Sequence, residues 1–221
     1  MTTNSIQHET FKDFIYASFD KIPQGLIVSD IACGQGGAGA RMLSLNANFV
    51  KFIDARPYPF YEGMKDWNKD ETISNFSFNR VDVEDELALS SSIAGSDVII
   101  YIGHLYHSIN PTKIIDTITK SSAKYLVIES KMNNPVSFEA DSTEPRIVKV
   151  MNNTSYSHSA WVPGNEQWVE VCQPNFAFTK KYLEDSNWNI EGWCKVIVNA
   201  PAIQNVRLEK EMQRYGFFCT R

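Results

Sequence analysis

A glycine-rich turn constrains this chain more than any other stretch. The apolar, β-prone residues 25–28 lead into residues 29–39, in which Gly34, Gly36 and Gly39 match the pattern G-x-G-x-x-G. The residues that follow are typical of the start of a helix. Glycines in such a turn let the backbone bend sharply and approach a ligand where a Cβ would clash. The sequence therefore predicts a nucleotide-binding turn between a first β-strand and a helix.

Asp30 indicates which kind of nucleotide the turn would bind. By itself the glycine pattern is typical of a dinucleotide site, and an acidic residue, Asp54, follows about twenty positions on. Dinucleotide folds, however, usually carry a small or apolar residue where Asp30 precedes the glycines. A carboxylate there favours a ligand with a positive charge and no pyrophosphate. S-adenosylmethionine is such a ligand, because it carries an ammonium and a sulfonium group.

Residues 28–36, VSDIACGQG, resemble motif I of the class I S-adenosylmethionine-dependent methyltransferases. The sequence departs from the motif at Ala32, where many members have their first glycine. The resemblance implies an α/β, Rossmann-like fold with a mostly parallel seven-stranded sheet, an antiparallel C-terminal strand and helices on both faces. It also implies S-adenosylmethionine as cofactor and S-adenosylhomocysteine as product. The cofactor-binding residues that it implies are Asp30, Ala32, Gly34, Gly36, Asp54, Ala55, Asp82, Val83, Gly103 and His104.

Two further predicted strands end in carboxylates. Residues 49–54 end in Asp54, a short acceptor that can take hydrogen bonds from both ribose hydroxyls. The alternating residues 75–82 end in Asp82. The resemblance implies that this carboxylate accepts a hydrogen bond from the adenine amine and that the next backbone N–H meets a ring nitrogen. Two alternatives stay open, namely Asp85 as the adenine contact and Asp82 as the cap of the following helix.

Two histidines and a tyrosine follow the fourth predicted strand. The apolar run 96–103 is typical of a central parallel strand, and open α/β sheets bind ligands where such strands end. Residues 103–107, GHLYH, resemble a G-x-L-Y-H segment in a branch of the family that includes tRNA wobble-uridine carboxymethyltransferases and many small-molecule enzymes. The resemblance implies that His104 lies near the methionine end of the cofactor. Tyr106 and His107 would face the substrate or brace the next helix.

Imidazole is a suitable base for the reaction that this resemblance implies. Methyl transfer is an in-line displacement at the sulfonium carbon, so the protein supplies alignment and, for an O–H or N–H acceptor, a base. Histidine performs that role at neutral pH. His107 is the first candidate and His104 the second, with Tyr106 beside them. The alternative, a histidine that only bonds to the backbone at the helix start, stays open.

The region after the fifth predicted strand points to a cap over the substrate side. Residues 123–129 predict that strand, which would end in Glu129, a candidate for substrate binding, for an ion pair or for a helix cap. The following residues are rich in Asn, Ser, Pro and Gly, which predicts an insertion at 131–174 within a single domain of residues 1–221. His158 and Trp161 of this insertion are candidate substrate-binding residues, and His158 is a third candidate base.

The C-terminal third predicts a helix and a closing pair of strands. The insertion itself would hold short strands at 146–151 and 166–172. Residues 176–186 then predict a helix with Thr179 as its N-cap. Strands at 190–198 and 215–220 would complete the sheet, which a dinucleotide-binding domain does not require.

Composition narrows the function classes. The chain is 43% hydrophobic and 21% charged with a formal net charge of −5, which indicates a globular fold and disfavours a nucleic-acid substrate. The cysteines form no C-x-x-C pair, so no metal site is expected. No signal sequence or membrane span is recognisable, so a cytoplasmic protein acting on a small molecule is the expectation.

Two alternatives to a small-molecule methyltransferase stay open. One is an RNA-modifying methyl- or carboxymethyltransferase, and the other is an NAD(P)-dependent oxidoreductase or a non-catalytic nucleotide-binding module. An RNA-modifying relative would need a basic face, which six residues could form: Lys180, Lys181, Lys195, Arg207, Lys210 and Arg214.

Overall fold

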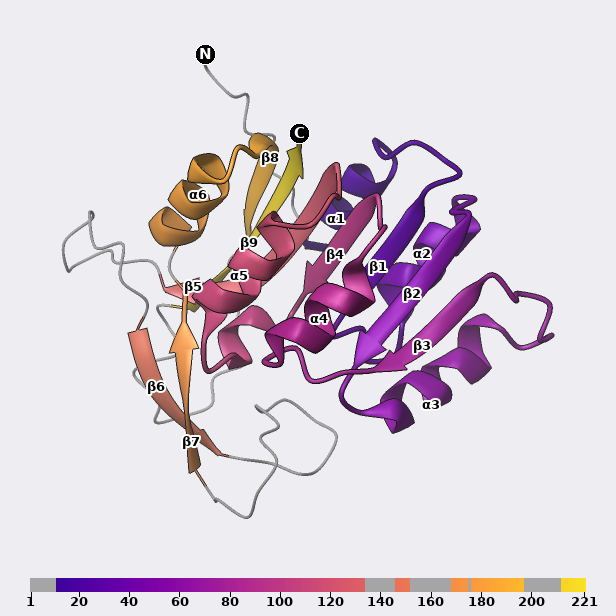
Figure 1. Cartoon of the computed structure of the whole chain (residues 1–221), viewed down its shortest axis with the longest axis horizontal. Helices are drawn as coiled ribbons and strands as arrows, with labels where there is room; N and C mark the ends of the chain where they lie inside the picture. The colour runs from indigo at the N-terminus through magenta and orange to yellow at the C-terminus, as the bar shows by residue number, and fades with distance from the viewer. Residues whose placement is uncertain (1–10, 134–145, 152–167, 175, 197–211) are drawn as a thin grey trace.

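A seven-stranded sheet forms the centre of the computed structural model, which describes residues 11–133, 146–151, 168–174, 176–196 and 212–221. The strands follow the spatial order β3-β2-β1-β4-β5-β9-β8 (Figure 1). Their bounds are β1 (Ile27–Ile31), β2 (Phe49–Asp54), β3 (Phe76–Arg80), β4 (Val98–Ile102), β5 (Tyr125–Asn133), β8 (Asn189–Val196) and β9 (Met212–Thr220). β9 pairs antiparallel with both of its neighbours, and the pairings among β1 to β5 are parallel. The predicted, mostly parallel sheet with an antiparallel C-terminal strand is confirmed.

Helices cover both faces of the sheet. Their bounds are α1 (Phe11–Phe19), α2 (Gly37–Ser44), α3 (Pro57–Trp67), α4 (Glu86–Ile93), α5 (Pro111–Thr119) and α6 (Phe176–Asp185). α1, α2 and α3 bury Phe19, Met42 and Phe60 in the core on one face. α4, α5 and α6 pack in a second core on the other face, which is turned toward the viewer in Figure 1. Within the described residues, no helix has the length and apolar character to span a bilayer.

The apolar run in the middle of the chain became the central strand, as predicted. In β4, Val98, Ile99, Ile100 and Tyr101 are all fully buried, because helices cover that strand on both sides. Each buried aliphatic side chain of this size contributes about 1.5–3 kcal/mol to stability. The carboxyl ends of β1, β2, β3 and β4 meet at one edge of the sheet, which brings the turns after these strands together.

The prediction that the fifth strand ends at Glu129 is wrong. β5 continues to Asn133, because its second half pairs with β9 after its pairing with β4 has ended at the register pair Ile102–Glu129. Glu129 therefore lies at the edge of the parallel part of the sheet but inside a longer strand. A partner that is distant in sequence extends this strand, and local periodicity carries no signal of such a partner.

Two strands of the predicted insertion form a separate hairpin. β6 (Arg146–Met151) and β7 (Trp168–Gln173) pair antiparallel, close to the predicted bounds, and β7 lies against the short 3₁₀ helix η1 (Leu105–His107) and against β5. The prediction of Thr179 as an N-cap is wrong. That residue is fully buried inside α6, which begins at Phe176.

Candidate functional site

The turn between β1 and α2 has a left-handed backbone at alternate positions. Ala32, Gly34 and Gly36 have φ values of 52°, 54° and 76°. The turn is closed by hydrogen bonds from the Cys33 N–H to the Ile53 carbonyl (3.1 Å) and from the Gly36 N–H to the Cys33 carbonyl (2.8 Å). A left-handed conformation costs a residue with a Cβ about 1–2 kcal/mol. Ala32 therefore adopts the backbone conformation that glycine adopts most readily.

Helix α3 supports this turn from the side. A Cβ on Gly63 would lie 2.2 Å from the Gln35 carbonyl oxygen, so only glycine lets α3 approach the turn so closely. The Trp67 indole N–H donates a hydrogen bond to the same oxygen at 3.1 Å. Sequence reasoning missed both residues, because neither belongs to the glycine motif and only the packing of α3 shows their contact.

Asp30 accepts a hydrogen bond at the start of α2. Its carboxylate is 2% exposed, and its Oδ2 accepts from the Gly39 N–H at 2.8 Å. The pKa of Asp30 is raised to about 7, mainly by burial; the Gly39 N–H opposes this shift, and the nearby Asp54 carboxylate adds to it. A negative charge at this position is thus costly unless a cation lies beside it.

Asp54 links two turns at the same edge. The side chain is buried, its Oδ2 accepts from the Gly34 N–H at 3.0 Å, and its Oδ1 accepts from the Arg56 N–H at 2.8 Å. The Arg56 Nε lies 3.4 Å from the same Oδ1. Ala55 follows directly, and its carbonyl accepts a hydrogen bond from Arg80 Nε at 3.3 Å. The structure therefore places the second predicted carboxylate against the glycine turn.

The loop after β3 shows which aspartate caps helix α4. Asp85 is the N-cap of α4 and accepts from the Ala88 N–H at 3.1 Å, so the alternative that Asp82 caps this helix is wrong. Asp82 Oδ1 instead accepts from the Glu84 N–H at 3.0 Å, and the neighbouring Val83 is buried. Glu84, which sequence reasoning did not select, holds the start of α5 through hydrogen bonds to its carboxylate.

Those hydrogen bonds link the β3–α4 loop to the histidine segment, residues 103–110, which contains His104 and His107. The N–H groups of Ile109 and Asn110 donate to the two Glu84 carboxylate oxygens at 2.8 and 3.3 Å. The loop that carries Asp82 and the loop that carries the histidines are therefore held side by side.

The histidine segment contains the short helix η1, with His104 just before it and Ser108 just after it. His104 Nδ1 lies 3.0 Å from the hydroxyl of the buried Tyr101, and that hydroxyl lies 3.3 Å from Ser108 Oγ. Burial lowers the pKa of His104 to about 4, so the ring is neutral at physiological pH. The His107 ring centroid lies 6.0 Å from that of His104 and 4.0 Å from that of Tyr106. The predicted candidate bases His104 and His107 thus lie together at the end of β4, beside Gly103.

Glu129 forms a buried ion pair on the neighbouring strands. The side chain is 0% exposed, and Arg214 Nη1 of β9 lies 3.4 Å from its Oε1. Neither carboxylate oxygen has a hydrogen-bond partner among the described residues. Burial raises the pKa of Glu129 to about 7, although Arg214 opposes the shift. Burial raises the pKa of the Tyr106 hydroxyl and the nearby Arg214 opposes the shift, so Tyr106 lies close to this ion pair.

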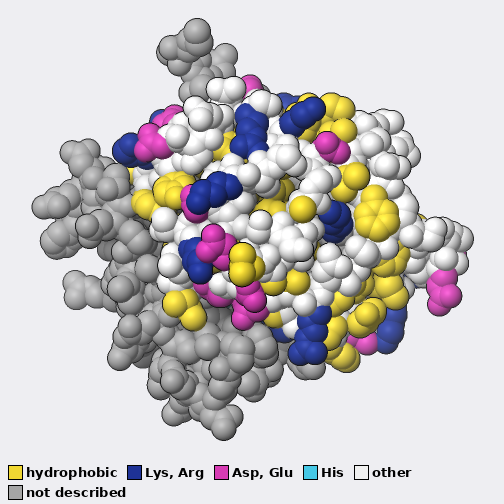
Figure 2. Space-filling model, in the orientation of Figure 1, with side chains coloured by type: hydrophobic (Ala, Val, Ile, Leu, Met, Phe, Trp, Pro, Cys, Tyr) yellow, Lys and Arg dark blue, Asp and Glu magenta, His cyan; other side chains and the backbone are white. Residues whose placement is uncertain are grey.

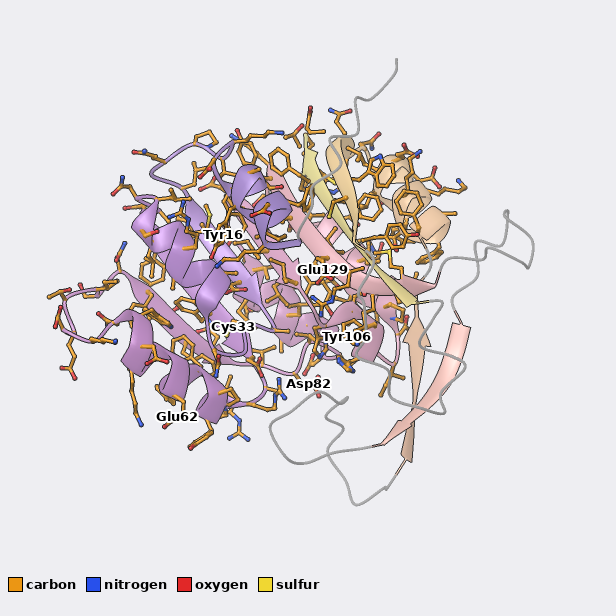
Figure 3. The ribbon with its side chains drawn as sticks, turned by 180° about the vertical axis from the view of Figure 1, so that it is seen from behind. Tyr16, Cys33, Glu62, Asp82, Tyr106 and Glu129 are labelled. Carbon is orange, nitrogen blue, oxygen red and sulfur yellow. The ribbon has the colours of Figure 1, made fainter. Side chains whose placement is uncertain are left out.

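The structure thus collects most of the predicted site residues along one edge, where Figure 3 shows Glu129, Tyr106 and Asp82 one below another. Asp30 and Asp54 each accept a hydrogen bond from an N–H group of residues 34–39. His158 and Trp161 lie outside the described residues. The ligand roles of all these residues stay predictions.

Comparison with known proteins identifies the fold. No protein-family model matches the chain, and no curated protein matches it. The solved N-terminal domain of EvdMO1, with S-adenosylhomocysteine and D-fucose present, matches with a TM-score of 0.65 and 12% identity over 97% of this chain and 84% of that one. Magnesium protoporphyrin IX methyltransferase (ChlM) from Synechocystis PCC 6803, with bound S-adenosylhomocysteine, matches with a TM-score of 0.59 and 14% identity over 95% and 81%. The chain has the class I methyltransferase fold.

A third structure limits what this fold implies. The [4+2]-cyclase SpnF matches with a TM-score of 0.61 and 13% identity over 95% of this chain and 80% of that one. Its name describes a cyclase, so one fold accommodates different reactions. At such low identities the similarity establishes the fold of this chain, and its function has to be argued from the site.

Proposed function

We propose that this chain is an S-adenosylmethionine-dependent methyltransferase that methylates an O or N atom of a small molecule. The observation that carries the proposal is the pair of buried carboxylates, Asp30 and Asp54, bonded to the N–H groups of the glycine turn at the carboxyl ends of β1 and β2. Such a site favours an adenosine derivative with a positive charge, because a cation would compensate the cost of the buried negative charge. A pyrophosphate would increase that cost.

The remaining predicted residues have consistent positions around this pair. We assign the ribose hydroxyls to Asp54 beside Ala55, and the adenine to Asp82 and Val83. The methionine end would lie against Ala32, Gly34 and Gly36 of the turn and against Gly103 and His104 after β4. When bound, S-adenosylmethionine supplies an electrophilic methyl group, and the chain orients the acceptor toward it.

The acceptor would lie between η1 and β5. Tyr106, His107 and Glu129 are the proposed residues on this side, together with His158 and Trp161 from the insertion at 131–174. Strand β7 of the β6–β7 hairpin lies against η1, as part of a cap over the acceptor would. The segment 103–107 supports kinship with the G-x-L-Y-H branch of the family.

Charge pairing favours a small-molecule acceptor over RNA. Of the six basic residues that could form a nucleic-acid surface, Lys180 and Lys181 pair with Glu184 and Asp185 at 3.1 and 2.5 Å, and Arg214 pairs with Glu129. On the face drawn in Figure 2, basic and acidic side chains are interspersed and form no continuous basic patch. A phosphate backbone would have to displace the paired carboxylates before binding.

Calorimetry with three ligands tests the cofactor assignment. We expect S-adenosylhomocysteine to bind the full chain with a micromolar or lower Kd, and NAD and NADP to give no measurable heat. Binding of NAD or NADP without binding of S-adenosylhomocysteine would overturn the proposal. Mass spectrometry of small molecules that co-purify with the protein would identify the acceptor.

Asp30→Asn is expected to change the pH dependence of stability. The folded pKa of about 7 lies above the ordinary value of 3.8, so the folded protein binds more protons than the unfolded chain between pH 4 and 7. The contribution of Asp30 to the free energy of unfolding therefore falls as the pH rises from 4 to 7. Asparagine keeps an oxygen for the Gly39 N–H but does not ionise. The free energy of unfolding of the variant relative to wild type should rise by about 2–4 kcal/mol from pH 4 to pH 8.

Urea unfolding of both proteins at several pH values, without ligand, measures this difference. The same substitution should weaken S-adenosylhomocysteine binding, because the site loses its negative charge. Parallel stability profiles of variant and wild type would show that Asp30 is already ionised at no cost, and would remove the electrostatic reason for a cationic ligand.

His107→Ala is expected to reduce turnover while leaving cofactor affinity nearly unchanged. A general base contributes about 10²–10⁴-fold to a rate, and the His107 side chain is the proposed base. The measurement is single-turnover methyl transfer to the acceptor found by co-purification, with added imidazole as a rescue. An undiminished rate in the variant would show that the reaction needs no base at this position.

A further inference from the structure

The buried hydroxyls of Tyr101 and Ser108 form a short hydrogen-bonded chain that ends at the His104 imidazole. Tyr101 and Ser108 are both 0% exposed. The Tyr101 hydroxyl lies 3.0 Å from His104 Nδ1 and 3.3 Å from Ser108 Oγ. No other side-chain hydrogen bond of Tyr101, His104 or Ser108 is present among the described residues. The directions of the two bonds therefore decide which nitrogen of the imidazole carries its proton.

Only one direction gives each buried hydroxyl an acceptor. The Ser108 O–H can donate to the Tyr101 oxygen, and the Tyr101 O–H can then donate to the Nδ1 lone pair of His104. The neutral imidazole must in that case carry its proton on Nε2. In the reverse direction Nδ1–H donates to Tyr101 and Tyr101 donates to Ser108, which leaves the Ser108 hydroxyl proton without an acceptor. An unsatisfied buried donor corresponds to a bias of about 5- to 150-fold against that arrangement.

We propose that Tyr101 and Ser108 hold His104 in the Nε2–H tautomer, so that its imidazole donates a hydrogen bond to an oxygen of a bound ligand and does not act as a base. The site therefore takes a ligand that presents a lone pair to this ring. The proposal rests on the proposed function only where it takes the ligand to be the cofactor or the methyl acceptor. His104 becomes a binding residue, and the role of base passes to His107.

The surroundings of the ring agree with a neutral donor. Burial is the main cause that lowers the pKa of His104, and Arg56 lowers it further, whereas Asp54 and Asp82 oppose the shift. Asp54 and Asp82, which we assign to cofactor binding, and Arg56, which lies beside Asp54, are therefore close enough to affect the charge of this imidazole. His104 Nε2 has no hydrogen-bond partner among the described residues, so a ligand oxygen can satisfy it.

Nitrogen-15 NMR of the full chain with labelled histidine tests the tautomer directly. The chain has four histidines, and comparison with the spectrum of His104→Gln assigns the His104 signals. At pH 7 we expect a protonated Nε2 and an unprotonated Nδ1, with the Nε2–H form favoured by at least about fivefold. A protonated Nδ1, or a doubly protonated ring at this pH, would overturn the proposal.

Two variants separate the roles of the hydroxyls. Tyr101→Phe removes the donor to Nδ1 with little change in volume, and should shift the tautomer ratio toward Nδ1–H by about fivefold or more. Ser108→Ala keeps the Tyr101 donor, so the Nε2–H form should persist. An unchanged ratio in Tyr101→Phe would show that the phenol does not set the tautomer.

Titration with S-adenosylhomocysteine then distinguishes the two sources of the oxygen. A change in the His104 Nε2 shift on saturation identifies an oxygen of the cofactor, and an unchanged shift with bound ligand followed by a change on addition of the co-purified acceptor identifies the acceptor; no change with either would contradict the donor role. If S-adenosylhomocysteine does not bind, the proposed function fails while the tautomer result stands. In methyl transfer, His104→Gln should keep at least a tenth of the wild-type rate because its amide still donates, and His104→Ala should lose more. Equal losses in both variants would contradict the donor role.

Discussion

Asp54→Ala is expected to weaken binding of S-adenosylhomocysteine about 10²- to 10⁴-fold. The substitution removes the proposed acceptor of the two ribose hydroxyls, and each hydrogen bond to a charged group contributes about 1.5–3 kcal/mol. It also frees the N–H groups of Gly34 and Arg56, which Asp54 holds at 3.0 and 2.8 Å. The glycine turn then loses its link to the β2–α3 turn. Calorimetric titration of both proteins measures the change.

Asp97→Ala is the matched control for this prediction. Asp97 Oδ2 also accepts a backbone N–H, that of Ile27 at 3.0 Å, but at the start of β1 and therefore at the opposite edge of the sheet. We expect this variant to lose some thermal stability and to bind S-adenosylhomocysteine with wild-type affinity. Binding by Asp54→Ala within threefold of wild type would contradict the assignment of Asp54 to the ribose.

Gly39→Ala is expected to lower the free energy of unfolding by about 2 kcal/mol. A Cβ on Gly39 would lie 2.4 Å from Phe52 Cε1 and 2.9 Å from Val50 Cγ1. Phe52 cannot move aside easily, because the rings of Phe60 and Trp67 lie 4.8 and 5.4 Å away. Overpacking of this kind costs about 1–3 kcal/mol and exceeds the gain in helix propensity. Thermal unfolding should show a Tm lower by about 4–8 °C.

Gly37→Ala provides the comparison in the same helix. A Cβ on Gly37 meets no atom within 4 Å, so the alanine should leave stability unchanged or raise it slightly. The double variant Gly39→Ala/Phe52→Leu should recover part of the loss, because the smaller side chain makes room. Equal Tm values for Gly37→Ala and Gly39→Ala would show that Phe52 yields, and that close packing does not require glycine at this point.

Local patterns were sufficient for the strands and for the glycine turn. The alternation and apolar runs of the sequence predicted β2 and β4 almost to the residue, because burial on a sheet repeats every second residue or covers both faces. Asp30 and Asp54 were predicted at strand ends, and the structure joins both to the turn. Each of these predictions depends on residues that are close in sequence.

Most of the errors arose where a segment distant in sequence decides the local structure, and one arose from the length of a loop. β5 extends past Glu129 because β9 supplies a partner strand, and Asp85 rather than Asp82 caps α4 because the loop after β3 is longer than the alternation indicates. Arg214 looked like part of a basic surface, yet the antiparallel pairing of β9 with β5 brings it to Glu129.

The sequence by itself determined the sheet of mostly parallel strands, the left-handed turn and the carboxylates that border it, since periodicity and backbone chemistry are local properties. The tertiary structure alone decided which residues far apart in the sequence meet. It set Gly63 against the Gln35 carbonyl and paired Glu129 with Arg214. Such contacts depend on strand order and helix packing, which bring together residues with no fixed spacing along the chain.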